Sequence, residues 1–99
     1  MTVLLQVDFP FQGPWGEEMA AAMEGLAKDI ASEPDLIWKI WTENAATGRA
    51  GGVYLFATAE AASAYATKHL ARLGDFGITG IVAHQFEVNS TLSRITRHG

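Results

Sequence analysis

Alternation of apolar and polar side chains is the first pattern along the chain. From Val3 to Phe9, apolar side chains occupy every second position, which is typical of a half-buried strand. Comparable apolar runs predict three more strands, over residues 36–43, 52–57 and 81–88. Residues 44–48 are rich in turn formers, so the second and third strands are expected to form a β-hairpin.

Two other stretches repeat their apolar residues at helical spacing. The first starts at Trp15, and Pro14 suits a first helical turn. It must end before Pro34, because a residue that precedes proline is pushed out of the helical region. The second helix is expected to begin after Thr58, a candidate N-cap, and to close at Gly74.

The predicted order β-α-β-β-α-β is that of the split-βαβ, ferredoxin-like arrangement. In this α+β fold, two helices cover one face of a four-stranded antiparallel sheet. A short further helix is predicted after Asn89, toward Arg97. With 99 residues and no linker-like stretch, residues 1–99 are expected to form a single domain.

The second and third strands are apolar on both sides. Trp38 and Trp41 lie three residues apart, so alternation sends them to opposite faces of the sheet. Residues 53–56 of the third strand are all apolar as well. A strand of this kind needs cover on both faces, so the sequence predicts a homodimer that packs sheet against sheet.

Composition narrows the class of function. Seven Lys and Arg oppose eleven Asp and Glu, for a net charge of −4, and the scattered basic residues make nucleic acid an unexpected partner. The absence of cysteine excludes disulfides, thiolate nucleophiles and cysteine-ligated metals. With no apolar run of membrane-spanning length and no signal-peptide pattern, the expectation is a cytoplasmic protein without membrane contact.

Several uncommon segments together resemble one family over essentially the whole chain. They are Gly13-Pro14-Trp15-Gly16, Trp38-Lys39-Ile40-Trp41-Thr42-Glu43, Gly51-Gly52-Val53-Tyr54-Leu55-Phe56, and Tyr65 with Lys68-His69 and Ala71-Arg72-Leu73. In order and spacing they are similar to the YdhR-type monooxygenases. The resemblance implies a dimeric α+β barrel related to the monooxygenases of antibiotic biosynthesis, which oxidise aromatic substrates with molecular oxygen and no bound metal or flavin. Trp15 departs from the phenylalanine expected there.

His69 is the leading candidate for a catalytic residue. It lies on the apolar stripe of the second helix, four residues after Tyr65, so the two side chains lie one above the other. An imidazole of ordinary pKa, near 6.5, suits proton transfer at neutral pH, and we take His69 and Tyr65 as the catalytic pair. The alternative is a hydrogen-bonded core histidine, and both interpretations predict burial.

Aromatic residues supply the candidate wall of a substrate pocket. Their flat faces suit stacking on an aromatic ligand, and the tyrosine hydroxyl can orient one. The residues expected to bind substrate are Trp38, Trp41, Tyr54, Phe56, Trp15 and, at the rim, Arg72. For any single aromatic, core packing is the competing interpretation. Glu43 is a second candidate for the rim, and an exposed ion pair is the alternative for both charged residues.

Three functions stay open at this point. The first is a cofactor-independent monooxygenase that acts on an aromatic or quinone-like molecule. The second is a non-catalytic module that binds a small molecule in the same pocket, because fold alone does not decide function. The third follows from a resemblance to haem-degrading monooxygenases, in which a histidine of the second helix binds the iron. Neither His84 nor His98 has metal-ligand spacing, so no metal site is expected.

Overall fold

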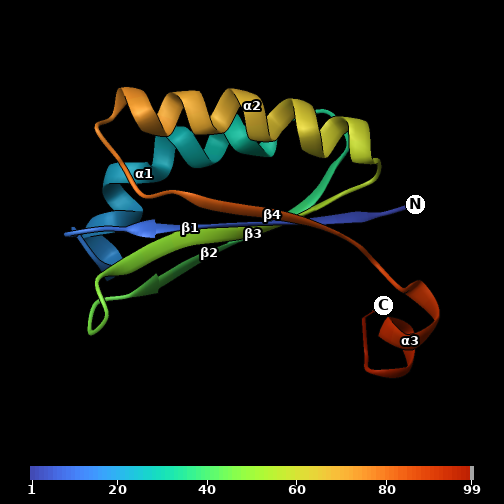
Figure 1. The fold of residues 1–99 in the computed structure, drawn as a ribbon. Coiled ribbons are helices and arrows are strands. Elements are labelled where there is room, and N and C mark those ends of the chain that lie inside the picture. Colours follow the sequence, from blue (N-terminus) through green and yellow to red (C-terminus); the bar gives the residue numbers. More distant parts are fainter. Residues whose placement is uncertain (99) are drawn as a thin grey trace.

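Four strands and three helices follow one another in the order β-α-β-β-α-β-α over residues 1–98, the part of the chain that the computed structural model describes. The strands are β1 (Val3–Pro10), β2 (Leu36–Asn44), β3 (Arg49–Phe56) and β4 (Val82–Glu87). The helices are α1 (Gly16–Ala31), α2 (Ala59–Asp75) and the short α3 (Ser90–Ile95). The strands pair antiparallel in the order β2-β3-β1-β4. Helices α1 and α2 cover one face of this sheet, and α3 lies on the other side (Figure 1). The predicted α+β fold of ferredoxin-like order is confirmed.

Two predicted helix caps are present. The Thr58 hydroxyl accepts a hydrogen bond from the Ala61 amide at 3.1 Å, which satisfies one of the free amides at the start of α2. The Asn89 side chain accepts from the Leu92 amide at 3.1 Å and caps α3 in the same way.

Two other helix ends differ from the prediction. Pro14 lies before α1, whose N-cap is Trp15, so the proline is not part of the first turn. Gly74 lies within α2, which continues to Asp75. The left-handed residue after this helix is Gly77, with φ of 84°. Glycine adopts that conformation without steric cost, so Gly77 follows the end of the helix, while Gly74 remains inside it.

The core lies between the sheet and the helices. All four apolar side chains that alternate along β1 are buried there, together with Tyr54 and Phe56 of β3. From α2, the residues at helical spacing pack on this layer: Ala62, Tyr65, Ala66, His69 and Leu73. Periodicity therefore predicted correctly which face of β1 and of α2 is buried.

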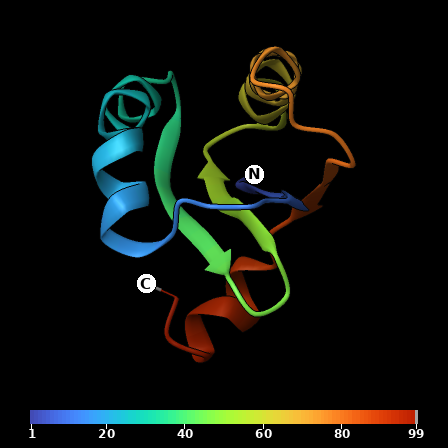
Figure 2. The same cartoon turned by 90° about the vertical axis from the view of Figure 1, so that its left-hand side faces the viewer.

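Helices α1 and α2 stand apart over different parts of the sheet, α1 beside β2 and α2 over β1 and β3 (Figures 1 and 2). The two helices are joined by ion pairs. Arg72 of α2 binds Asp29 of α1 at 2.8 Å, and Lys68 of α2 binds Glu33 just after α1. Such pairs fix the relative position of the helices more than they add stability.

The sheet face without α1 and α2 exposes several large apolar side chains. Trp38 pairs with Leu55 and Trp41 with Gly52, so the two tryptophans project to opposite faces, as predicted. On the face of Trp38, Ile40 is 57% exposed and Phe86 of β4 is 50% exposed. Large apolar side chains rarely gather on a solvent-facing sheet without a partner. None of the helices within residues 1–98 is both long enough and apolar enough to cross a membrane.

Candidate active site

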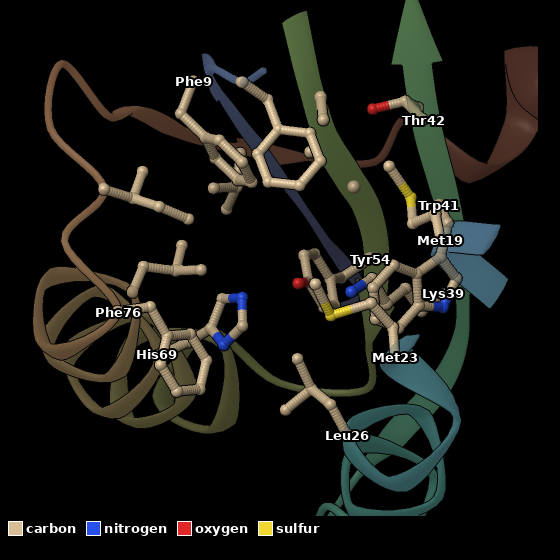
Figure 3. A pocket seen from close by; sticks show the side chains of 17 residues that line it. Phe9, Met19, Met23, Leu26, Lys39, Trp41, Thr42, Tyr54, His69 and Phe76 are labelled. Atoms are coloured by element: carbon tan, nitrogen blue, oxygen red, sulfur yellow. The ribbon is translucent and has the colours of Figure 1, made fainter. Parts of the chain in front are cut away.

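A cavity lies between α1 and α2, above β3 (Figure 3). Most of its lining is apolar: Met19, Met23 and Leu26 come from α1, and Leu73 comes from α2. Val7 and Phe9 of β1, Ala50, Gly51 and Gly52 of β3, and Phe11, Phe76 and Ile78 of the loops complete this surface. Five lining residues carry polar groups, namely Lys39, Trp41, Thr42, Tyr54 and His69. An apolar chamber with a few converging polar groups is the usual form of a small-molecule site.

His69 projects from α2 into this cavity and is 4% exposed. Its Nδ1 lies 3.0 Å from a terminal nitrogen of Arg72. A guanidinium can only donate, so Nδ1 accepts this hydrogen bond and the proton of the neutral imidazole is on Nε2. Burial, with added repulsion from Lys39 and Arg72, lowers the pKa of His69 to about 3. The pKa of His69 therefore lies well below the unperturbed value near 6.5, and His69 is neutral at physiological pH.

Arg72 positions His69 from outside the cavity lining. Its guanidinium also binds Asp29 of α1, so the carboxylate, the guanidinium and the imidazole form a continuous hydrogen-bonded chain. This chain fixes the orientation of the ring and the nitrogen that carries the proton. Arg72, which was expected at the rim of the pocket, does not line the cavity. Its side chain contacts His69, which does.

Tyr65 and Tyr54 form a second polar pair beside His69. The Tyr65 hydroxyl donates to the Tyr54 hydroxyl at 3.1 Å, which leaves the Tyr54 proton free to be donated elsewhere. Desolvation is the main reason why the pKa of each tyrosine is raised, so both stay protonated. The Tyr65 ring stacks on His69 with centroids 5.0 Å apart, but only Tyr54 lines the cavity. Tyr65 is therefore a supporting residue behind the wall.

Lys39 of β2 is the site residue that sequence reasoning missed. Its ammonium lies 3.4 Å from the centre of the Trp41 ring and 4.7 Å from that of Tyr54. Burial, with a smaller contribution from Arg72, lowers the pKa of Lys39 to about 7. The signal was present in the sequence, because Lys39 is two residues from Trp41 and alternation puts both on the face that α1 covers.

Comparison with known proteins decides the family. The family model described as "Putative mono-oxygenase ydhR" matches residues 4–99. The chain belongs to the ydhR family. The crystal structure of a putative antibiotic biosynthesis monooxygenase from Deinococcus radiodurans superposes with a TM-score of 0.56 over 90% of this chain and 93% of that one. At 15% identity, this likeness shows the fold alone. No curated protein matches the chain.

For this member of the ydhR family, the structure separates the predicted wall residues into two groups. Trp41 and Tyr54 line the cavity, with Trp41 37% exposed at its edge. Phe56 does not line it, and its ring stacks on that of Tyr54 in the fully buried core. Trp38 lies on the opposite face of the sheet, and the Trp15 ring packs edge-on against Phe11 at 5.4 Å.

Glu43 has a structural contact that the sequence did not indicate. Its carboxylate accepts a hydrogen bond from the Gly16 amide at 2.9 Å. Gly16 is the first residue of α1, where free amides and the positive end of the helix dipole favour an acidic partner. Glu43 therefore holds the start of α1 against β2. It does not line the main cavity.

His69 does not fit the pattern of a haem ligand. A histidine that binds a metal through one ring nitrogen normally donates the proton of the other to an acceptor. Here Nδ1 accepts from a guanidinium, so a metal on Nε2 would displace the only ring proton of a neutral imidazole. Lys39 and Arg72 add positive charge beside the ring. Among residues 1–98, no group of three or more His, Cys, Asp or Glu side chains is placed to hold a metal ion.

Proposed function

We propose that this ydhR-family protein is a monooxygenase that inserts one oxygen atom of O₂ into a hydroxylated aromatic or quinone-like molecule. The observation that carries the proposal is the cavity itself. An apolar chamber edged by Trp41 suits a flat ring, while Lys39, Tyr54 and His69 offer polar contacts to its oxygen atoms.

The proposed reaction uses the substrate as its own electron source. An acidic methylene carbon flanked by aromatic rings loses a proton to water, and the carbanion reduces O₂ to a peroxide anion bonded to that carbon. The anion takes a proton back from water to become the hydroperoxide. Loss of water then leaves a carbonyl, so that R₂CH₂ and O₂ give R₂CO and H₂O. The protein's part is to bind the ring, stabilise the anion and exclude water.

The proposed catalytic roles follow from the hydrogen bonds. His69 presents its Nε2 proton, and Tyr54 its hydroxyl proton, to the substrate oxygen on which negative charge develops. Tyr65 acts through Tyr54, and Arg72 acts through His69. Donors that are already oriented in a dry site stabilise a developing anion strongly, because little reorganisation is needed when the charge forms.

Oxygen uptake tests the proposed function directly. We expect the purified protein to consume O₂ with at least one member of a panel of anthrones and dihydroxy-aromatics, with one product carbonyl formed per O₂. An oxygen electrode and mass spectrometry of products formed under ¹⁸O₂ measure both quantities. Saturable binding of these compounds with no uptake above the protein-free rate would instead identify a binding module.

We also propose that the protein works as a homodimer joined through the open sheet face. The exposed Ile40 and Phe86 on that face support this, together with Trp38 on the same face. A stable interface there should bury more than roughly 1,000 Å².

Ile40→Asp tests the homodimer. We expect light scattering to show a dimer for the parent protein at micromolar concentration and a monomer for this variant, because a carboxylate would be buried without a partner. Ala71→Asp, on the exposed side of α2, is the matched control and should stay dimeric. A monomeric parent protein would refute the proposal.

A further inference from the structure

Lys39 is a half-buried cation with no carboxylate partner among residues 1–98. Neither the ion pairs nor the side-chain hydrogen bonds found within residues 1–98 include its ammonium group. The rings of Trp41 and Tyr54 are its close neighbours, and they compensate only part of the lost hydration. A charged group held in this way costs stability, and groups of this kind are concentrated at functional sites.

The sequence makes room for this side chain in an unusual way. A Cβ atom at Gly52 would lie 2.7 Å from Cε of Lys39, so the missing side chain at Gly52 forms the slot that Lys39 occupies. Gly52 faces Trp41 across the strand pair, and both line the cavity. The lysine is therefore packed in a defined position at the cavity wall.

Within residues 1–98, the cavity lining contains the basic side chains of Lys39 and His69 and no acidic one, although the protein as a whole is acidic. No Asp or Glu is among the described residues that line it, while the chain carries a net charge of −4. The ionisable groups that face Lys39 are His69 and Arg72 from α2 and Tyr54 from β3. Helix α1 contributes only Met19, Met23 and Leu26 to this wall.

We propose that Lys39 binds an acidic group of the ligand, so that the cavity selects aromatic molecules that carry a carboxylate or an ionised hydroxyl. The anion would lie between the Lys39 ammonium and the Nε2 proton of His69, which face the cavity from opposite sides (Figure 3). This inference rests on the proposed function, which places the substrate in this cavity. It adds that the substrate carries an acidic group. If Lys39 is neutral when a phenol arrives, transfer of the phenol proton to the amine gives the same ion pair.

Benzoate and benzamide are suitable probes, because they share size and shape and differ in charge. We expect the parent protein to bind benzoate more tightly than benzamide in NMR titrations, with shifts at Tyr54 and His69. Since the pKa of Lys39 is lowered to about 7, its charged fraction falls about 25-fold between pH 6.5 and 8.5. Benzoate stays ionised over this range, so its affinity should fall by up to that factor, and that of benzamide should not.

Three variants separate binding from structure. Lys39→Met should weaken benzoate at pH 6.5 at least tenfold, change benzamide less than threefold, and unfold at the same or a higher temperature than the parent. Lys39→Arg should keep benzoate binding and lose its pH dependence, because a guanidinium does not titrate here. Lys28→Met, which removes a lysine whose side chain is 77% exposed and pairs only within α1, is the control for net charge and should bind like the parent.

Equal loss of both probes in Lys39→Met, a benzoate affinity that does not change with pH, or no benzoate binding to the parent protein would each overturn the proposal. The result is independent of turnover. Benzoate binding that depends on Lys39, in a protein that consumes no oxygen, would support the charge selection and refute the monooxygenase.

Discussion

Gly51→Ala is expected to destabilise the protein by about 3 kcal/mol, the overpacking penalty of a site that cannot relax. Gly51 pairs with Asp8 across the β1–β3 ladder at the centre of the sheet. A Cβ atom there would overlap the carbonyl oxygen of Val7 and lie 2.8 Å from its carbonyl carbon. These are backbone atoms of a buried strand, so they cannot move aside as the end of a side chain would.

Chemical denaturation followed by tryptophan fluorescence measures this loss. The parent protein and its variants must be compared at one protomer concentration, because the proposed dimer would make the midpoint depend on concentration. Gly74→Ala is the matched control. It lies inside α2 with open space around it, so alanine should stabilise the helix by about 0.5–1 kcal/mol. A Gly51→Ala variant within about 0.5 kcal/mol of the parent, the usual range of surface substitutions, would contradict the expected clash.

The fold was predictable because each of its main elements has a clear period. Alternation along β1 and helical spacing along α2 identified the buried faces, and the element order then indicated the ferredoxin-like fold. The errors occurred at helix ends. Pro14 and Gly74 suited the positions assigned to them by residue type, but neighbouring residues took those roles. More than one nearby residue can cap or end a helix, so the preference of a residue type for such a position does not by itself fix where the helix begins or ends.

The site was less predictable because it depends on contacts between distant segments. Burial of His69 followed from its place on the α2 stripe, but its pKa depends on Arg72 and on Lys39, which lies on another element. Alternation along β2 assigned Trp38 and Trp41 to opposite faces of the sheet, but only the positions of the helices show that Trp41 is the one that lines the cavity. Phe56 has the same parity as Tyr54 and still lies too deep in the core.

The charge state of His69 leads to the second large effect, a loss of turnover. If neutral His69 acts as a hydrogen-bond donor through Nε2, then His69→Phe removes the donor and keeps a ring against Tyr65. The loss of one oriented donor to a developing oxyanion typically reduces kcat about 10²–10³-fold. His69→Gln retains an N–H group in the same region, so we expect it to lose less than tenfold.

The two variants together distinguish donation from proton transfer. A glutamine amide can donate a hydrogen bond but cannot carry a proton to or from the substrate. If His69→Gln lost as much activity as His69→Phe, His69 would have to move a proton during turnover, and the hydrogen bond from Arg72 to Nδ1 would have to break in the cycle. Unfolding of both variants at a much lower temperature than the parent would assign His69 to the core. Burial keeps the pKa of His69 near 3, so titration of His69 should not change kcat between pH 6 and 7. The pH profiles of kcat for the parent protein and for His69→Gln should therefore have the same shape in this range.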